Sequence, residues 1–201
     1  MTTVTVNKEN KAFIHPYKVI LYLSMTSMLM FFAITTSALL VKKGDIVSWE
    51  AFKLPSIFYV STVILLASSI AMHFAKNLYR DAKFSLSRMV MFIGVLLSIV
   101  FLFTQYMGFQ SLMAIGKPLA GNASGSFVYV IVMAHGVHII GGILFALIIL
   151  INAFRNRNNQ QFEYTNTINP KRLLALELLS TYWHFIDLIW IYLFIFFYFN
   201  Y

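Results

Sequence analysis

Five long apolar runs, separated by short polar segments, dominate the pattern of this sequence. The runs cover about residues 19–41, 54–75, 89–109, 127–154 and 173–201. A membrane-spanning helix needs about 20 apolar residues, and each run is long enough. Hydrocarbon offers the backbone no hydrogen-bond partners, so spanning segments are helices or closed barrels, and the short alternating strands of a barrel are absent. The sequence therefore predicts an all-α integral membrane protein: one domain over residues 1–201, a bundle of five transmembrane helices.

Composition supports this class and excludes others. The chain is 60% hydrophobic and 11% charged, too little polar surface for a water-soluble globule. Its formal charge of +8 could indicate nucleic-acid binding, but the basic residues lie in the short segments between apolar runs, so we expect no nucleic-acid partner. The absence of cysteine excludes disulfides, iron–sulfur clusters and thiolate metal sites in this chain.

The distribution of basic residues predicts the orientation. Eleven of the fifteen Lys and Arg side chains fall in the N-terminal tail and in the second and fourth loops, which lie on one side of the membrane. Loops rich in Lys and Arg stay in the cytoplasm. We therefore expect a cytoplasmic N-terminus and an external C-terminus.

Polar residues in the last apolar run form a single stripe. At 100° per residue, a sector about 120° wide contains Glu177, Ser180, Thr181, His184 and Asp187, flanked by Trp183 and Trp190. A charge at mid-membrane costs about 2.5 to 3.5 kcal/mol even on insertion scales. The stripe should therefore face helices of this chain or of a partner, and the two indole N–H groups could find partners beside it.

The fourth run carries a second polar group. His135 and His138 share a helix face with Gly142, and Gly136 lies nearby. Small residues let a neighbouring helix approach closely. His138 and His184 are expected at a similar depth, so the two groups could meet in one polar seam.

Several interpretations of the histidines remain open. Hydrogen-bonded packing in a polar seam is the interpretation that the residue pattern favours most. A b-type haem would need axial histidines on facing helices, and a proton or ion pathway could use Glu177, His184 and Asp187. His135, His138, His184 and Asp187 are suitable ligand types for a zinc or copper ion. The sequence shows no pattern of further residues that would orient those ligands, so a metal site is not favoured.

The motifs also resemble a known family. The last run reads Glu177, then Tyr182-Trp183-His184-Phe185-x-Asp187-x-x-Trp190, and the fourth reads His135-Gly136-x-His138 with Gly142. Supporting matches are Gln105 in the third run and Leu65-Leu66-Ala67-Ser68-Ser69 with His73 in the second. These residues resemble subunit III of the haem-copper oxidases in its short, five-helix bacterial form.

Two positions depart from that family's pattern. The family often has an intramembrane glutamate after a Thr-Ser pair in the first helix, whereas this chain reads Thr26-Ser27-Met28. Gly108 stands where an acidic residue often follows the glutamine. Roles that depend on the intramembrane glutamate are therefore not implied for this chain.

The resemblance implies a non-catalytic core subunit of an aerobic terminal oxidase of the cytochrome c type. It implies no catalytic, cofactor-binding or metal-binding residue in this chain, with haem and copper in partner subunits. Subunit I would be the main contact, with subunit II and membrane lipids as further partners, in the bacterial cytoplasmic membrane. The implied role is to stabilise subunit I and support proton uptake.

Three alternatives to this role are considered. Within the family, the chain could be subunit III of a quinol oxidase, which has the same five-helix length. From other classes, a haem-b membrane electron carrier would bind haem itself, and a small proton-coupled transporter would need no partner. The transporter is disfavoured because the five runs show no inverted repeat.

Overall fold

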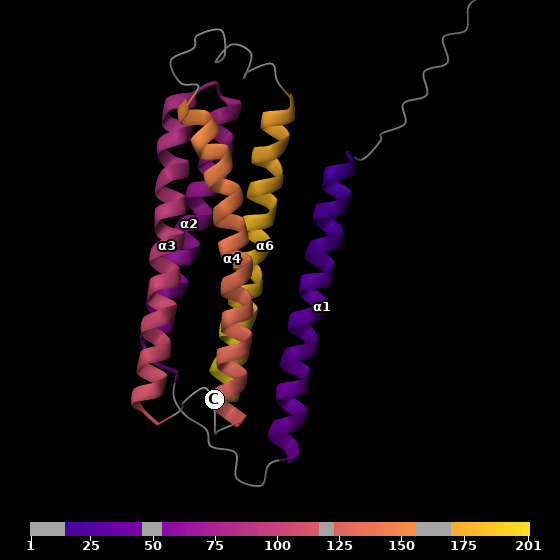
Figure 1. The fold of residues 1–201 in the computed structure, drawn as a ribbon, viewed down its shortest axis with the longest axis vertical. Helices are drawn as coiled ribbons and strands as arrows, with labels where there is room; N and C mark the ends of the chain where they lie inside the picture. The colour runs from indigo at the N-terminus through magenta and orange to yellow at the C-terminus, as the bar shows by residue number, and fades with distance from the viewer. Residues whose placement is uncertain (1–14, 46–53, 117–122, 156–169) are drawn as a thin grey trace, which may run out of the picture.

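The part of the chain that the structure describes forms a bundle of five long α-helices (Figure 1). The computed structural model describes residues 15–45, 54–116, 123–155 and 170–201, and these contain α1 (Pro16–Asp45), α2 (Ile57–Arg80), α3 (Phe84–Ala114), α4 (Ala123–Arg155) and α6 (Pro170–Asn200). All five helices are long and apolar enough to span a membrane, and the described residues contain no strand. The predicted fold class, an all-α membrane protein with five transmembrane helices, is confirmed.

The helix ends differ from the ends of the apolar runs. Four of the five helices begin before the first residue of the predicted apolar run that they contain, because polar residues can continue a helix into the headgroup region. Pro16 begins α1, a position that suits its fixed φ, and Lys42 and Lys43 lie in the last turn, where cations favour the negative end of the helix dipole. α2 instead begins at Ile57, three residues after its run begins, since Pro55 and Ser56 precede the helix.

α2 and α3 form the most extensive helix pair, joined by a three-residue turn. Ala82 in this turn has a φ of 58°, and the Lys83 N–H donates to the Leu78 carbonyl. Serine hydroxyls tie the two helices together: Ser68 and Ser98 lie 2.7 Å apart, and Ser87 donates to the Ala75 carbonyl at 2.7 Å. The pair is a tight antiparallel hairpin.

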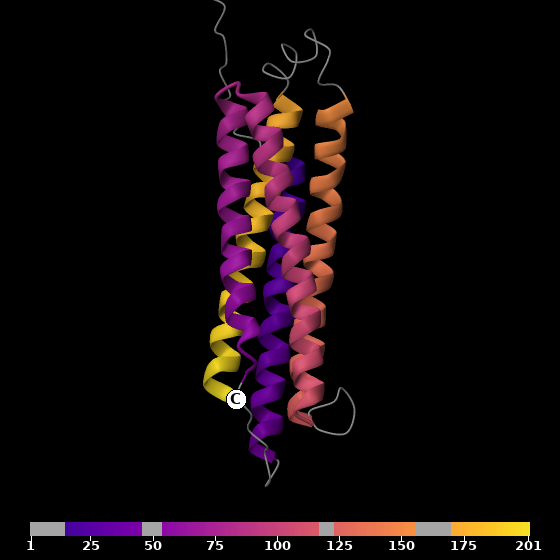
Figure 2. The ribbon, with the colours of Figure 1, turned by 90° about the vertical axis from the view of Figure 1, so that its left-hand side faces the viewer.

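α6 contacts three of the other four described helices, as α4 also does. It packs against α1, α2 and α4, whereas α1 contacts only α4 and α6 extensively. Figure 1 shows α1 at the side of the bundle away from the α2–α3 hairpin, and in Figure 2 it lies behind that hairpin. The residues of the predicted stripe on α6 are therefore positioned to meet several neighbours.

Candidate functional site

The polar stripe of α6 divides among three environments. Ser180 and Asp187 are buried inside the bundle, with exposures of 2% and 3%. Glu177 and Thr181 are half-buried, and His184 is exposed on the outside of the bundle. Residues in the same angular sector of the helix therefore differ in how deeply they are buried.

Glu177 joins three helices near one end of the bundle. Its carboxylate accepts from Lys18 Nζ of α1 at 3.4 Å and from Arg80 Nη2 of α2 at 3.1 Å. The Thr181 hydroxyl one turn later donates to the Glu177 carbonyl. A cavity of about 190 Å³ adjoins this ion-pair cluster, and Lys76 contributes a further cation to its lining.

His184 binds α2. Its Nδ1 lies 2.7 Å from the Ser69 hydroxyl, and its ring centroid lies 5.6 Å from that of His73. His73 is also exposed. The two histidines form an imidazole pair on the outer side of the α2–α6 contact.

Both flanking tryptophans also bond to α2. Trp183 Nε1 donates to the Ser68 hydroxyl at 3.2 Å, and Trp190 Nε1 donates to Thr62 Oγ1 at 2.9 Å. Nearby, Gln105 Nε2 of α3 donates to the Ser61 hydroxyl at 2.9 Å. α2 therefore supplies a row of hydroxyl groups along the hairpin and α6.

Most of these hydroxyls were not predicted as site residues. A signal for them exists in the sequence: Ser61 and Ser68 are seven residues apart, and so are Thr62 and Ser69. That spacing places each pair on one helix face. A second polar stripe on α2, facing α6 and α3, could have been inferred from it.

The α4 histidines lie in different surroundings from His184. His135 is fully buried, and its ring lies 5.1 Å from Trp190, 6.1 Å from Phe32 and 6.2 Å from Phe101. Neither of its nitrogens makes a hydrogen bond within the described residues. His135 is thus enclosed by aromatic rings from three helices.

His138 bonds its own helix. Its Nδ1 lies 2.7 Å from the Ala134 carbonyl, and its carbonyl accepts from the Tyr182 hydroxyl at 3.1 Å. Its ring lies 5.9 Å from Phe32 of α1. Tyr182, which lies outside the predicted stripe, therefore joins α6 to α4 here, whereas the side chains of His138 and His184 contact different neighbours.

Asp187 lies in an apolar surrounding between α2, α4 and α6. Neither carboxyl oxygen has a hydrogen bond of ordinary geometry among the described residues, but the Ser69 hydroxyl, which lies 2.7 Å from His184 Nδ1, also makes a polar contact with the carboxyl. The carboxyl borders a narrow void, lined also by Leu65, Ile139, Trp183 and Ile186, with no room for a water-sized sphere. Burial of this group is costly, since a buried polar group without full hydrogen bonding loses its bonds to water.

The two predicted packing glycines differ in how closely they are approached. A Cβ at Gly142 would lie 3.1 Å from Tyr182 Cε1 and 3.2 Å from Trp183 Cζ3. At Gly136 the nearest atom, Leu102 Cδ2, would be 3.8 Å away, which is ordinary contact. Gly142 is therefore the point where α6 aromatic rings lie against the α4 backbone.

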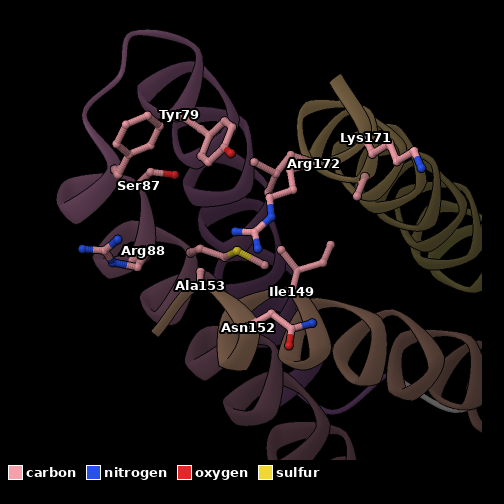
Figure 3. Close-up of a pocket in the computed structure, with 12 residues that line it drawn as sticks. Tyr79, Ser87, Arg88, Ile149, Asn152, Ala153, Lys171 and Arg172 are labelled. Carbon is pink, nitrogen blue, oxygen red and sulfur yellow. The ribbon is translucent and has the colours of Figure 1, made fainter. Parts of the chain in front are cut away.

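A basic cavity of about 210 Å³ lies between α2, α3, α4 and α6 (Figure 3). Figure 3 shows the Arg172 side chain reaching into its middle, below Tyr79, with Arg88 and Lys171 at opposite edges. Lys171 and Arg172 lie in the first turns of α6, at the same end of that helix as Glu177. This is the end that the sequence assigns to the cytoplasmic side.

The described residues offer no cluster of three or more His, Asp or Glu side chains that could hold a metal ion. Met28, at the position where the resemblance leads us to expect an intramembrane glutamate, is buried at 6% exposure. What the polar side chains do in this geometry is hold helices together by hydrogen bonds. The predicted location of haem and copper in partner subunits stays a prediction.

Comparisons with known proteins agree on one family. A family profile described as Cytochrome c oxidase subunit III matches residues 13–201. Cytochrome c oxidase subunit 3 of Bacillus sp. (strain PS3) is 32% identical over 148 residues, which cover 72% of this chain and 65% of that protein. The Bacillus subtilis (strain 168) protein of the same name is 32% identical over 155 residues, 75% of this chain and 68% of that protein.

An animal relative is also similar to this chain. Cytochrome c oxidase subunit 3 of Drosophila yakuba is 28% identical over 152 residues, covering 75% of this chain and 51% of that protein. The matched region thus spans between about half and two thirds of the length of these relatives.

Proposed function

We propose, from the premise that the chain belongs to the cytochrome c oxidase subunit III family, that it is a non-catalytic core subunit of an aerobic haem-copper oxidase. The predicted family resemblance is confirmed by the profile match and by the bacterial relatives. In the proposed complex, haem and copper lie in subunits I and II. This subunit stabilises subunit I and supports proton uptake during oxygen reduction.

The observation that carries the proposal is how the last-helix motif uses its polar groups. Trp183, His184 and Trp190 each place a ring nitrogen on a hydroxyl of α2. These side chains hydrogen-bond one helix to another, which fits a subunit that supports the complex better than one that carries out redox chemistry. The chain belongs to an oxidase subunit family, so we propose that it plays this supporting role within an oxidase complex.

Subunit I is proposed as the main partner, with subunit II and membrane lipids as further contacts. The chain is a multi-pass membrane protein by its five spanning helices. Its similarity to Bacillus proteins supports a bacterial cytoplasmic membrane as its location. The N-terminus is proposed to face the cytoplasm, from the bias of its basic residues.

The alternatives receive less support. The relatives reported above are named for cytochrome c oxidase, which does not favour the quinol oxidase branch. A haem-b carrier needs two histidines facing each other across a haem. His135 is instead packed among Phe32, Phe101 and Trp190, and His184 is bonded to Ser69.

Purification of the tagged chain from its native membranes tests the proposal. We expect a complex that contains a haem protein and a copper-bearing subunit II and that oxidises reduced cytochrome c. A partner without that copper site, together with quinol oxidation, would support the quinol branch instead. A stoichiometric haem Soret band on the isolated chain would overturn the proposal.

A further inference from the structure

Two cavities with basic linings lie toward the end of the bundle where α6 begins, and they differ in how their charge is balanced. In the cavity of about 190 Å³, the carboxylate of Glu177 pairs with two of the three cations that line it. The cations that line the cavity of about 210 Å³ are Arg88, Lys171 and Arg172. Among the lining residues of this second cavity that the structure describes, none is acidic.

The side chain of Arg172 reaches into the second cavity. Figure 3 shows it in the middle, with Tyr79 above it and Asn152 below it. A guanidinium carries five N–H donors and stays charged, whereas a hydroxyl or an amide oxygen can accept hydrogen bonds but cannot neutralise the charge. The positive-inside bias explains why cations gather at this end of the bundle. It does not explain why one of them points into a cavity.

Two helix dipoles add to the positive potential of this cavity. Arg172 is the third residue of α6, and Arg88 is the fifth residue of α3. Both therefore lie near the positive ends of their helix dipoles, where a cation is unfavourable and an anion is favourable. Neither helix has an acidic residue in its first turn. An anion in the cavity would be stabilised by the cations and by both helix ends.

The size of the cavity and the number of its cations indicate which anion fits. Drug-sized ligands occupy about 300 to 1,000 Å³, so a cavity of about 210 Å³ takes a small group. A carboxylate has a single charge and two acceptor oxygens. A terminal phosphate has about 1.5 to 2 negative charges and three acceptor oxygens, and the fork of an Arg side chain binds it through two parallel hydrogen bonds. Three cations therefore match a terminal phosphate better than a carboxylate.

We propose that the cavity between α2, α3, α4 and α6 binds a terminal phosphate group. Arg172 binds the phosphate oxygens, and Arg88 and Lys171 attract the group from the edges of the cavity. The phosphate belongs either to a soluble compound or to phosphatidic acid in the adjoining membrane leaflet. This site goes beyond the proposed function and does not depend on which complex contains the chain.

Protection of a cysteine from alkylation tests the site. The chain has no cysteine, so Ala153→Cys, in the lining of the cavity, introduces a thiol whose reaction with N-ethylmaleimide can be followed on this chain. The variant is used together with the subunits that purify with it. We expect inorganic phosphate at about ten times its Kd to slow the alkylation about tenfold relative to acetate at the same ionic strength.

Reconstitution into vesicles separates the two sources of phosphate. The Ala153→Cys variant is placed in phosphatidylcholine vesicles, with or without phosphatidic acid. Protection by phosphatidic acid without added inorganic phosphate identifies the lipid as the source, and protection by inorganic phosphate in phosphatidylcholine alone identifies a soluble compound. Protection by neither probe, or equal protection by acetate, would overturn the proposal.

Charge-matched substitutions distinguish the cavity from general attraction to a basic surface. Arg172→Gln and Lys76→Gln each remove one cation toward the same end of the bundle, but Lys76 lines the other cavity. We expect Arg172→Gln to abolish the protection and Lys76→Gln to keep it. Arg88→Gln, on another helix, should weaken the protection and serves as the test if the Arg172→Gln chain does not fold. Equal loss in the Lys76→Gln chain, or protection that survives both arginine substitutions, would contradict the site.

Discussion

Gly142 sets how closely α6 approaches α4. Two aromatic side chains of α6 lie so close to it that a Cβ would be 3.1 and 3.2 Å from their rings, and a larger residue would have to displace them. Its neighbour Gly141 has nothing within 4 Å of a built Cβ. Substitution of Gly142 therefore tests the packing of α6 against α4, and the same substitution at Gly141 is its control.

We predict that Gly142→Leu destabilises the folded chain by about 1 to 3 kcal/mol, because overpacking must displace Tyr182 and Trp183. Gly141→Leu is the control, since it gains the same helix propensity without a clash. Thermal unfolding in detergent measures both. Equal midpoints for the two variants would show that Gly142 does not set the approach.

Substitution of Asp187 should affect thermal stability differently from substitution of Gly142. Its carboxyl oxygens have no hydrogen bond of ordinary geometry among the described residues, and an unsatisfied buried group costs about 1 to 3 kcal/mol. We predict that Asp187→Leu keeps or raises the thermal midpoint of the chain, whereas Asp187→Asn, which keeps buried polar atoms, does not raise it. A fall for Asp187→Leu as large as that for Gly142→Leu would mean that the carboxyl holds the fold.

The sequence located these side chains in a sector but could not assign their surroundings. Asp187 and His184 are only about 60° apart on the helix, yet one is buried and the other exposed. Which neighbour covers each side depends on how α1, α2 and α4 are arranged around α6. Helix periodicity contains no information about that arrangement.

At the scale of the helices, α1 and α6 run side by side in the same direction and are joined by polar contacts along their length. Lys18 pairs with Glu177 at one end, and Lys43 Nζ donates to the Asn200 carbonyl at 2.8 Å at the other. Between them, the Thr36 and Tyr192 hydroxyls lie 2.8 Å apart. Because α1 buries fewer residues than the other helices, these contacts matter most for its docking.

Tyr192→Phe is predicted to lower the stability of the chain by about 0.6 to 1 kcal/mol, the usual worth of a hydrogen bond between membrane helices. Tyr198→Phe, at an exposed position of the same helix, removes a hydroxyl without breaking a bond to α1. The difference between their thermal midpoints isolates the Thr36–Tyr192 contact. No difference would mean that α1 docks by apolar packing alone.

The number of membrane-spanning helices was predictable because a long apolar run in bilayer hydrocarbon can satisfy its backbone hydrogen bonds only as a helix or in a closed barrel. The ends were less predictable: α3 begins five residues before its apolar run and continues five residues beyond it. Polar residues at a membrane surface can extend a helix or end it, and local composition does not decide between these outcomes. The links between helices, above all the hydroxyl row on α2, required the structure.

For the whole molecule, the basic residues predict which end faces the cytoplasm. The chain has no cysteine, so single cysteines can report on sidedness. We predict that Asp45→Cys, at the end of α1, reacts with a membrane-impermeant maleimide added outside intact cells. Asp81→Cys, in the α2–α3 turn, should react only after the membrane is opened; the reverse pattern would invert the orientation.

The central claim is that this chain supports an oxidase without carrying its redox centres. The most direct measurement is the haem content, copper content and oxygen uptake of the purified complex before and after this chain is removed. We predict that haem and copper per subunit I stay unchanged and that the depleted complex loses its oxygen-uptake activity faster, because subunit I no longer has the subunit that stabilises it. Loss of haem or copper in proportion to the chain removed would contradict the claim.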